Sequence, residues 1–267
     1  ARAHAENRPL VRRKCTSYFP RGPLYAMSSP AKKQKTQTAP KVALITGGAR
    51  RIGAAIARTL HAEGMNLIVH YRNSVDNAQL LADDLNRYRS GSVALARADL
   101  EKTEDCSSLA QQAVDAFGRI DALINNASAF SPTPIGKVSE AHWDTLIGVN
   151  LKAPFFLSQA CAEALTSTRG TIINLTDIYA ERPLPKHPVY SASKAGLLTL
   201  TRSLAQELSP DVRVNAIAPG AILWPESGDT QENQEEIIRR TPLGRLGDPD
   251  DIAGTVLFVL RDAPFST

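Results

Sequence analysis

The sequence predicts an α/β fold in which one doubly wound parallel sheet carries helices on both of its faces. Two observations predict this fold. From residue 41 onward, short runs rich in β-branched residues alternate with longer amphipathic segments, which is typical of strand–helix–strand units with right-handed crossovers. Glycine and polar residues follow directly after these runs, at the end of the sheet where ligands bind in such folds.

Each element is expected from its own pattern. Strands are expected where apolar and β-branched residues are concentrated, over 42–46 (VALIT), 66–71 (NLIVHY), 92–96 (SVALA), 121–125 (DALIN), 171–175 (TIINL) and 212–217 (VRVNAI). Helices are expected where apolar residues recur at helical spacing, over 51–63, 76–89, 105–117, 139–167 and 188–208. The sequence has no internal repeat of solenoid length and no second change of composition, so residues 41–267 are expected to form one domain.

Charge is distributed unevenly along the chain. The 267 residues include 31 Lys and Arg and 27 Asp and Glu, which gives a net charge of +4. Residues 1–40 hold nine of the bases and a single acid, so the rest of the chain carries an excess of acids. Because the basic charge is confined to the tail, we expect neither a nucleic acid nor a membrane as partner.

Residues 1–40 are expected to be a disordered basic tail, since five prolines and scattered charge leave little apolar surface to bury. Residues 1–26 are interpreted as sequence upstream of a start at Met27, and a nucleic-acid-binding arm is the alternative. No apolar run approaches the roughly 18 residues of a membrane helix. The three cysteines lack CxxC spacing, which favours a reducing compartment, the cytoplasm, without disulfides or a zinc site.

A glycine-bearing turn, TGGARRIG at 46–53, connects the first strand to the first helix. Glycines allow positive φ angles and let the backbone approach a pyrophosphate, whose charge is favoured by the free N–H groups of a helix start. The turn therefore predicts a dinucleotide site, and a purely structural turn is the alternative. The residues expected to hold the dinucleotide here are Thr46, Gly47, Arg51, Ile52 and Gly53.

The end of the second strand favours a phosphorylated dinucleotide. NAD sites usually place a carboxylate about 20 residues after the glycine turn, whereas this strand ends in His70 and Tyr71, followed by Arg72. Arg72 and Ser74 can hydrogen-bond a 2′-phosphate, so these four residues predict an NADPH site; a merely solvated Arg72 is the alternative. Asp99, after the third strand, is expected to accept from the adenine amino group or to cap a helix.

Tyr190 and Lys194 lie four residues apart in a predicted helix and therefore on one of its faces. An ammonium group in this place can lower the pKa of the tyrosine and favour proton transfer near neutral pH. Such a pair also occurs by chance in helices. Its combination with the glycine turn, the Asn125-Asn126-Ala127 run, Asn150 and Pro219-Gly220 is specific.

With these motifs, residues 41–267 resemble the short-chain dehydrogenase/reductase family. The resemblance implies a Rossmann-type sheet, a nicotinamide cofactor, a small-molecule substrate and a homotetramer. It implies that Tyr190 donates a proton, that Lys194 binds the nicotinamide ribose and tunes Tyr190, and that Asn150 supports the proton relay. The other cofactor contacts that it implies are Asn126, Ala127, Ser128, Pro219 and Gly220.

Three departures from the general family pattern resemble the pteridine reductase subgroup. Arg51 replaces the middle glycine of the turn, and Asp177, thirteen residues before Tyr190, replaces the usual catalytic serine. Ser128 replaces the glycine after Asn-Asn-Ala and is followed closely by Phe130. The subgroup implies a pterin or folate ring held between the nicotinamide and Phe130, with Arg51 and Ser128 bonding the cofactor phosphate and the pterin edge.

Asp177 suits the reduction of a ring C=N bond, because a carboxyl group with a raised pKa can protonate nitrogen beside Tyr190. The alternatives are a helix or turn cap for Asp177 and a core position for Phe130. The predicted reaction converts dihydropterin, dihydrofolate or oxidised pterin to the tetrahydro form with NADPH. A carbonyl reductase acting on a 3-oxoacyl thioester through Tyr190 and Lys194 is the alternative function, and a non-catalytic nucleotide sensor is a third.

Three further predictions concern the remaining residues. Trp224 is expected to cover the nicotinamide or the pterin, and residues 224–235 are expected to form a mobile lid. The histidines are not spaced as metal ligands, so no metal is predicted; among them, His187 is expected at the surface near the substrate. Relatives continue through a last strand, so the chain is expected to be truncated before the final edge strand.

Overall fold

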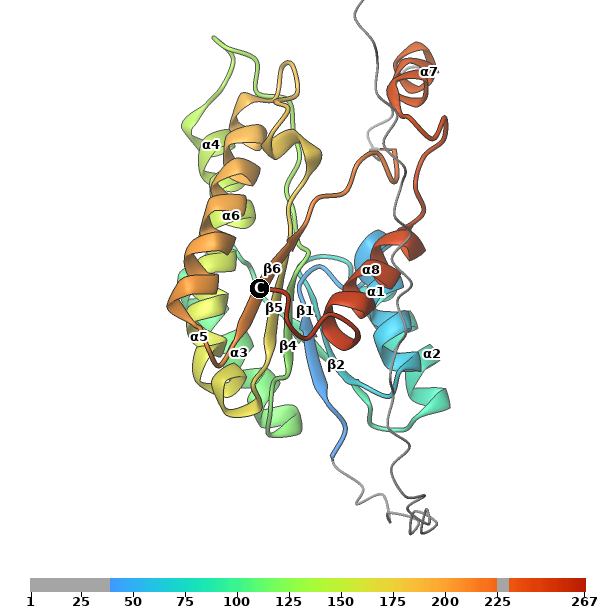
Figure 1. The fold of residues 1–267 in the computed structure, drawn as a ribbon, viewed down its shortest axis with the longest axis vertical. Coiled ribbons are helices and arrows are strands. Elements are labelled where there is room, and N and C mark those ends of the chain that lie inside the picture. Colours follow the sequence, from blue (N-terminus) through green and yellow to red (C-terminus); the bar gives the residue numbers. More distant parts are fainter. Residues whose placement is uncertain (1–38, 225–230) are drawn as a thin grey trace, which may run out of the picture. The chain divides into compact units, whose positions relative to one another are not determined.

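The computed structural model describes residues 39–224 and 231–267. Six strands form one parallel sheet in the order β3-β2-β1-β4-β5-β6 (Figure 1). The strands are β1 (Val42–Ile45), β2 (Asn66–Tyr71), β3 (Val93–Arg97), β4 (Ala122–Asn125), β5 (Thr171–Leu175) and β6 (Arg213–Ile217). The predicted doubly wound parallel sheet is confirmed.

Eight α-helices connect or follow the strands within the described residues. They are α1 (Arg51–Ala62), α2 (Val75–Tyr88), α3 (Thr103–Phe117), α4 (Glu140–Ile147), α5 (Ala153–Thr168), α6 (Pro188–Glu207), α7 (Gln231–Arg240) and α8 (Pro249–Arg261). None of the helices in these ranges has the length and apolar character of a membrane span. The tail predicted to be disordered and the predicted start at Met27 lie outside the described residues, apart from 39 and 40.

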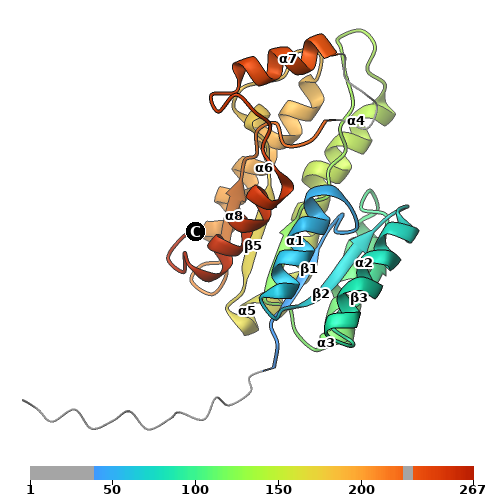
Figure 2. The same ribbon diagram turned by 90° about the vertical axis from the view of Figure 1, so that its right-hand side faces the viewer.

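Alternate residues of each buried strand point to opposite faces of the sheet, where two apolar layers form. Ala43 and Ile45 of β1 pack with buried residues of α1, α2 and α8. Val42 and Leu44 of the same strand pack with buried residues of α3, α5 and α6. Figure 1 shows these two groups of helices on either side of the sheet, and Figure 2 shows α8 beside α1. The prediction of helices on both faces is therefore confirmed.

The strand order reverses between β1 and β4. The chain runs outward from β1 to β3, returns to place β4 beside β1, and then runs outward to β6. Ala43 pairs with Ala122 and Ile45 with Ile124, so the carboxyl ends of the two central strands lie side by side. In sheets of this kind, ligands bind in the crevice outside such a switch point.

The structure differs from the sequence prediction mainly at the helix expected over 139–167. It is interrupted after α4 by a π-helical turn, η1 (Gly148–Lys152), before α5 begins. Apolar periodicity runs through both parts and does not reveal a one-turn change of hydrogen bonding. The other predicted boundaries agree to within two residues. Of the lid predicted over 224–235, residues 225–230 lie outside the described part, and α7 begins at residue 231.

Helix α8 was not expected from the sequence. It begins with a capping box, in which the side chain of Asp248 accepts from the main chain of the first turn and Asp251 accepts from the N–H of Asp248. Such reciprocal bonds satisfy N–H groups that a helix start leaves free. The segment combines this capping signal with an amphipathic pattern, so it was recognisable and the sequence analysis missed it.

Gly53 in α1 makes the switch point compact. A Cβ atom at this position would lie 2.2 Å from the carbonyl oxygen of Gly47 and 2.7 Å from Nδ2 of Asn126. Both are well inside van der Waals contact, and the first belongs to the main chain. Glycine is therefore required here by close approach, whatever ligand the turn holds.

We predict that Gly53→Ala lowers the free energy of unfolding by roughly 1–3 kcal/mol, because the added methyl group overpacks the site. Gly254→Ala in α8 is the matched control, because its added Cβ meets open space and alanine favours helix by roughly 0.5–1 kcal/mol. Chemical denaturation of the three proteins tests both. Equal stabilities of Gly53→Ala and the unchanged protein would show that the turn relaxes and that the close approach is not a constraint.

Candidate functional site

The glycine turn rests on His70 at the end of β2. The main-chain N–H of Gly47 donates to Nδ1 of His70 at 3.1 Å, and Nε2 of His70 lies 3.2 Å from the carbonyl oxygen of Ala98. Burial lowers the pKa of His70, which favours the neutral ring with its proton on Nε2. Both ring nitrogens are thus used within the protein, so the predicted contribution of His70 to a cofactor site is to support Gly47.

Hydrogen bonds join the ends of the two central strands. The hydroxyl oxygen of Thr46 accepts from the main-chain N–H groups of Asn126 and Ala127 at 2.9 and 3.0 Å. The side-chain amide of Asn126 donates to the carbonyl oxygens of Thr46 and Gly47 at 2.8 and 3.1 Å. Four residues predicted to hold a cofactor are therefore brought together. They form a cradle whose floor is the closely packed Gly53.

Arg51 begins α1 with a φ angle of +53°, in the left-handed region that glycine adopts most easily. Glycine would adopt this conformation at lower cost than arginine. Its Nη2 donates to the carbonyl oxygen of Trp224 at 3.0 Å. The structure therefore brings together two residues, Arg51 and Trp224, that were predicted separately as substrate contacts.

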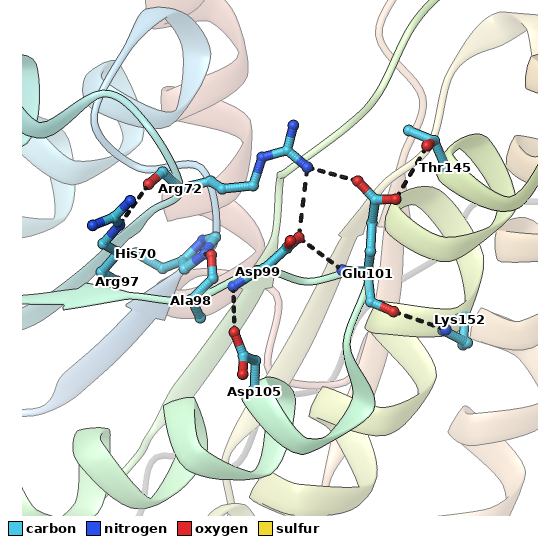
Figure 3. A network of polar contacts seen from close by, with 9 residues as sticks. All are labelled: His70, Arg72, Arg97, Ala98, Asp99, Glu101, Asp105, Thr145 and Lys152. Atoms are coloured by element: carbon cyan, nitrogen blue, oxygen red, sulfur yellow. Dashed lines mark hydrogen bonds and ion pairs between the residues drawn. The ribbon is translucent and has the colours of Figure 1, made fainter. Parts of the chain in front are cut away.

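A pocket of about 490 Å³ lies at the ends of β2 and β3. Its lining includes Arg72, Arg97 and Asp99. Nη1 of Arg72 lies 2.6 Å from Oε1 of Glu101 and 3.5 Å from Oδ1 of Asp99 (Figure 3). Arg72 is thus paired rather than merely solvated. A basic side chain beside a cavity of this size fits the adenosine end of a phosphorylated dinucleotide.

Two other predicted cofactor residues border the same region. Ser74 stands at the N-cap position of α2, and its side chain makes no capping hydrogen bond. Asp99 does not cap α3, because the N-cap residue of that helix is Lys102. The helix-cap alternative for Asp99 is therefore wrong: its main-chain N–H donates to Asp105 at 2.7 Å, and its Oδ1 accepts from the N–H of Glu101 at 3.3 Å.

Asp177 and Tyr190 form the centre of the predicted catalytic group. The phenolic oxygen of Tyr190 donates to Oδ2 of Asp177 at 2.6 Å. Oδ1 of Asp177 accepts from the N–H of Tyr179 at 2.9 Å, which caps a short 3₁₀ turn, η2 (Ile178–Ala180). Asp177 is therefore both a turn cap and a direct partner of Tyr190, and the two interpretations of this residue do not exclude each other.

Lys194 is buried one helical turn after Tyr190 on α6. Its Nζ donates to the carbonyl oxygen of Leu175 at 2.9 Å and lies 5.8 Å from the centre of the Tyr190 ring. Burial lowers the pKa of Lys194 to about 8, although the charge of Asp177 acts in the opposite direction. The buried ammonium group of Lys194 therefore has a pKa close to neutral pH.

Lys194 does not bring the pKa of Tyr190 below its ordinary value in this structure. The pKa of Tyr190 is raised, first by burial and then by the charge of Asp177 and its hydrogen bond. A carboxylate that accepts the phenolic proton stabilises the neutral tyrosine. The pKa of Asp177 is itself raised by burial, against the effects of Tyr190, Tyr179 and Lys194. A raised pKa at Asp177 is what its predicted role as an acid requires.

Asn150 is buried in the π-helical turn and makes four side-chain hydrogen bonds. Its Oδ1 accepts from Ser128 Oγ at 3.2 Å and from the N–H of Ala129 at 2.7 Å. Its Nδ2 donates to the carbonyl oxygen of Ala129 at 2.9 Å and to Ser193 Oγ at 3.0 Å. The side chain thus holds the loop after β4 against α6, and its predicted part in the proton relay stays a prediction.

Phe130 lies on the loop after β4 and is 45% exposed, so it is not a core residue. Its ring meets the Tyr190 ring edge to face at 4.8 Å and is stacked on the His187 ring at 4.7 Å. Phe130 therefore stands at the edge of the catalytic group, as predicted for an aromatic substrate contact. Of the predicted residues at the β6 end, Pro219 accepts from the N–H of Ile178 through its carbonyl oxygen, at 3.1 Å.

Sequence reasoning missed three residues that organise this site: Glu101, His187 as a stacking partner, and Ser193. Glu101 follows the third strand by a few residues, so the rule that ligands bind beyond strand ends could have included it. Ser193 is one helical turn after Tyr190, which places it on the same face. For the stacking of His187 on Phe130 the sequence gives no signal, because the contact joins two loops.

Comparisons with known proteins agree with this geometry. A family profile described as enoyl-(acyl carrier protein) reductase matches residues 47–266. A 3-oxoacyl-[acyl-carrier-protein] reductase of Staphylococcus epidermidis is 34% identical over 225 residues, which are 83% of this chain and 92% of the relative. One from a Synechocystis species is 35% identical over 227 residues, with 83% and 90% covered.

A solved structure shows the same arrangement in space. It is the crystal structure of a blue fluorescent protein from a metagenomic library in complex with NADPH, with a TM-score of 0.81 and 32% identity. The similarity covers 86% of this chain and 94% of that protein. The matching profile, relatives and fold, together with the Tyr190–Lys194 pair beside the glycine cradle, show that the chain belongs to the short-chain dehydrogenase/reductase family.

Proposed function

We propose that the chain is an NADPH-dependent reductase that converts a dihydropterin or dihydrofolate, and also oxidised pterin, to the tetrahydro form. The observation that carries the proposal is the 2.6 Å hydrogen bond between Tyr190 and Asp177, at a carboxyl group whose pKa is raised by burial. Reduction of a ring C=N bond needs a proton delivered to nitrogen, and a carboxyl group with a raised pKa is suited to deliver it.

The cofactor proposal rests on the fit of the glycine cradle and the Arg72 pocket. The main chain leaves no room for a side chain at Gly53, and Gly47 has a φ angle of +59°, so the turn would let a pyrophosphate approach the start of α1. Arg72 and Ser74 would hold the 2′-phosphate, and the similar structure with NADPH supports this choice. When bound, the nicotinamide supplies the hydride.

The chain's own residues then supply protons and orientation. Tyr190 is hydrogen-bonded to Oδ2 of Asp177. When the carboxyl group is protonated, Tyr190 can pass its phenolic proton to the ring nitrogen and take the proton of the carboxyl group, which is left ionised and regains a proton from solvent. Lys194 holds a positive charge beneath this pair and would bind the nicotinamide ribose. Asn150 fixes the loop that presents Ser128 and Phe130. The exposed flat face of Phe130 suits a fused aromatic ring.

A 3-oxoacyl thioester reductase is the second candidate, because two of the compared relatives carry that name. The comparisons support this alternative better than they support a pterin substrate, although the identity is only 34–35%. Tyr190 and Lys194 would serve it in the same roles. Asp177 argues against it, because this residue stands at the position where the general family pattern has a catalytic serine.

We also propose that the chain works as a homotetramer in the cytoplasm with no partner but its small molecules. The family resemblance supports the tetramer. Cys106 and Cys161 are free and buried, as is typical of proteins from a reducing compartment. Light scattering of the purified protein tests the assembly, and a mass of one subunit would exclude it.

We predict that Asp177→Ser lowers kcat/KM for dihydrobiopterin by about 10²-fold or more, the usual effect of losing a general acid. NADPH affinity should change little, because Asp177 lies outside the cradle. The measurement of kcat/KM follows the consumption of NADPH, with dihydrobiopterin, dihydrofolate and acetoacetyl thioester compared side by side. Asp211→Ser, at an exposed position before β6, is the control and should keep full activity.

The same assay separates the candidate functions. Pterin turnover that collapses in Asp177→Ser supports the pterin proposal and the role of the acid together. Turnover of the thioester alone, unharmed by this substitution, would overturn the pterin proposal in favour of the second candidate. If NADPH binds but none of these substrates is reduced by either protein, a nucleotide sensor is the remaining interpretation.

We predict that Lys194→Met abolishes activity. We also predict that the variant gains stability relative to the unchanged protein as the pH falls. A lysine whose folded-state pKa is lowered to about 8 contributes stability that is present above its unfolded pKa and is lost as the pH falls through 8. The free energy of unfolding of the variant, relative to the unchanged protein, should therefore rise by about 2 kcal/mol between about pH 9.5 and 7.

Denaturation at the two pH values tests this expectation. The exposed Lys137→Met is the control and should show no such difference, since its ammonium stays in water in both states. A Lys194→Met protein whose relative stability is the same at both pH values would mean that the buried ammonium carries no desolvation cost.

A further inference from the structure

Arg72, the residue proposed to hold the 2′-phosphate, is bound by two carboxylates. Glu101 and Asp99 both approach Nη1 of its guanidinium, at 2.6 and 3.5 Å (Figure 3). One cation thus faces two anions. A 2′-phosphate carries a charge between −1 and −2 near neutral pH, so in this place it would meet a local excess of negative charge.

The two carboxylates differ in how firmly they are held. The carboxylate of Asp99 accepts one main-chain bond, at Oδ1 from the N–H of Glu101 at 3.3 Å, and the N–H of Asp99 donates to Oδ2 of Asp105 at 2.7 Å. Glu101 is held at its carboxylate by side chains alone, Arg72 and the hydroxyl of Thr145, which donates to Oε2 at 3.1 Å. Exposed pairs of this kind contribute little free energy, so the contact of Glu101 with Arg72 is readily exchanged.

A second cation stands beside Glu101. Nζ of Lys152, in the π-helical turn, donates to the main-chain carbonyl oxygen of Glu101 at 2.8 Å (Figure 3). This bond holds the main chain of Glu101, while the Thr145 hydroxyl stays as a partner of the carboxylate once Arg72 is taken by another anion. Glu101 is therefore placed to yield Arg72, whereas Asp99 stays where it was predicted to meet the adenine amino group.

We propose that Glu101 competes with the cofactor's 2′-phosphate for Arg72 and so sets how strongly the chain prefers NADPH over NADH. The proposal rests on the NADPH site of the proposed function. It assigns Glu101 a role in specificity through Arg72, without contact with the reacting atoms. Removing the charge of Glu101 frees Arg72 and removes a repelling anion, so both effects strengthen binding of the 2′-phosphate.

The test compares two probes that differ only in the 2′-phosphate, adenosine 2′,5′-bisphosphate and adenosine 5′-monophosphate. Calorimetry measures their dissociation constants with the full chain, Glu101→Gln and Arg72→Gln. We expect Glu101→Gln to increase the preference for the bisphosphate by about two- to tenfold at low salt, with a smaller gain at high salt. Arg72→Gln should lose most of the preference.

Glu104→Gln is the matched control, because Glu104 is an exposed glutamate in the first turn of α3. Its preference should equal that of the unchanged protein. An unchanged or weaker preference in Glu101→Gln, in a protein that does prefer the bisphosphate, overturns the competition and makes Glu101 a support for Arg72. Equal affinities for both probes in every variant overturn the NADPH site, and this inference with it.

Discussion

The rest of the site depends on the close contact between the ends of β1 and β4. There the Thr46 hydroxyl and the Asn126 amide join the two halves of the sheet by hydrogen bonds of 2.8–3.1 Å, directly above a glycine that has no space for a Cβ atom. Parallel strands bring their carboxyl ends to one edge. The loops after β4 and β5 therefore start from fixed points, and Phe130 and Asp177 are aimed at the same space.

The protein buries polar groups in this region and joins them by hydrogen bonds, although Oδ1 of Asn125 is left without a partner. Asn125 at the end of β4 donates to Asn174 of β5, which donates to Thr201 of α6 at 2.9 Å. Lys194, on the same helix, donates to the main chain at the end of β5. Buried polar groups without partners are costly, whereas a connected network fixes one arrangement of its elements. The helix that carries Tyr190 is thereby held against the strand that leads to Asp177.

Much of the fold could be predicted from sequence, because strands buried on both faces and amphipathic helices differ in period. The β1 and β2 strands, and the turn at 46–53, were predicted from local patterns alone. The Asp177–Tyr190 contact followed from matching two motifs to one family pattern. The π-helical turn at Asn150 could not be predicted from sequence, since the side-chain bonds of Asn150 reach a distant loop. For the same reason, the pairing of Arg72 with Glu101 became visible only when strand ends were placed in space.

In the proposed pterin reduction, Asp177 is the feature that separates this chain from 3-oxoacyl reductases with which it shares a third of its residues. The shared residues build the sheet, the glycine cradle and the Tyr190–Lys194 pair. Hydride transfer from a nicotinamide uses these parts whatever the substrate is. A carboxyl group in place of a hydroxyl changes what lies beside the tyrosine from a neutral donor to a titrating acid. Burying such a group is costly unless it is hydrogen-bonded, and here Tyr179 and Tyr190 both donate to it. The proposal therefore rests on Asp177 and its partners and not on overall identity, which reflects the shared scaffold.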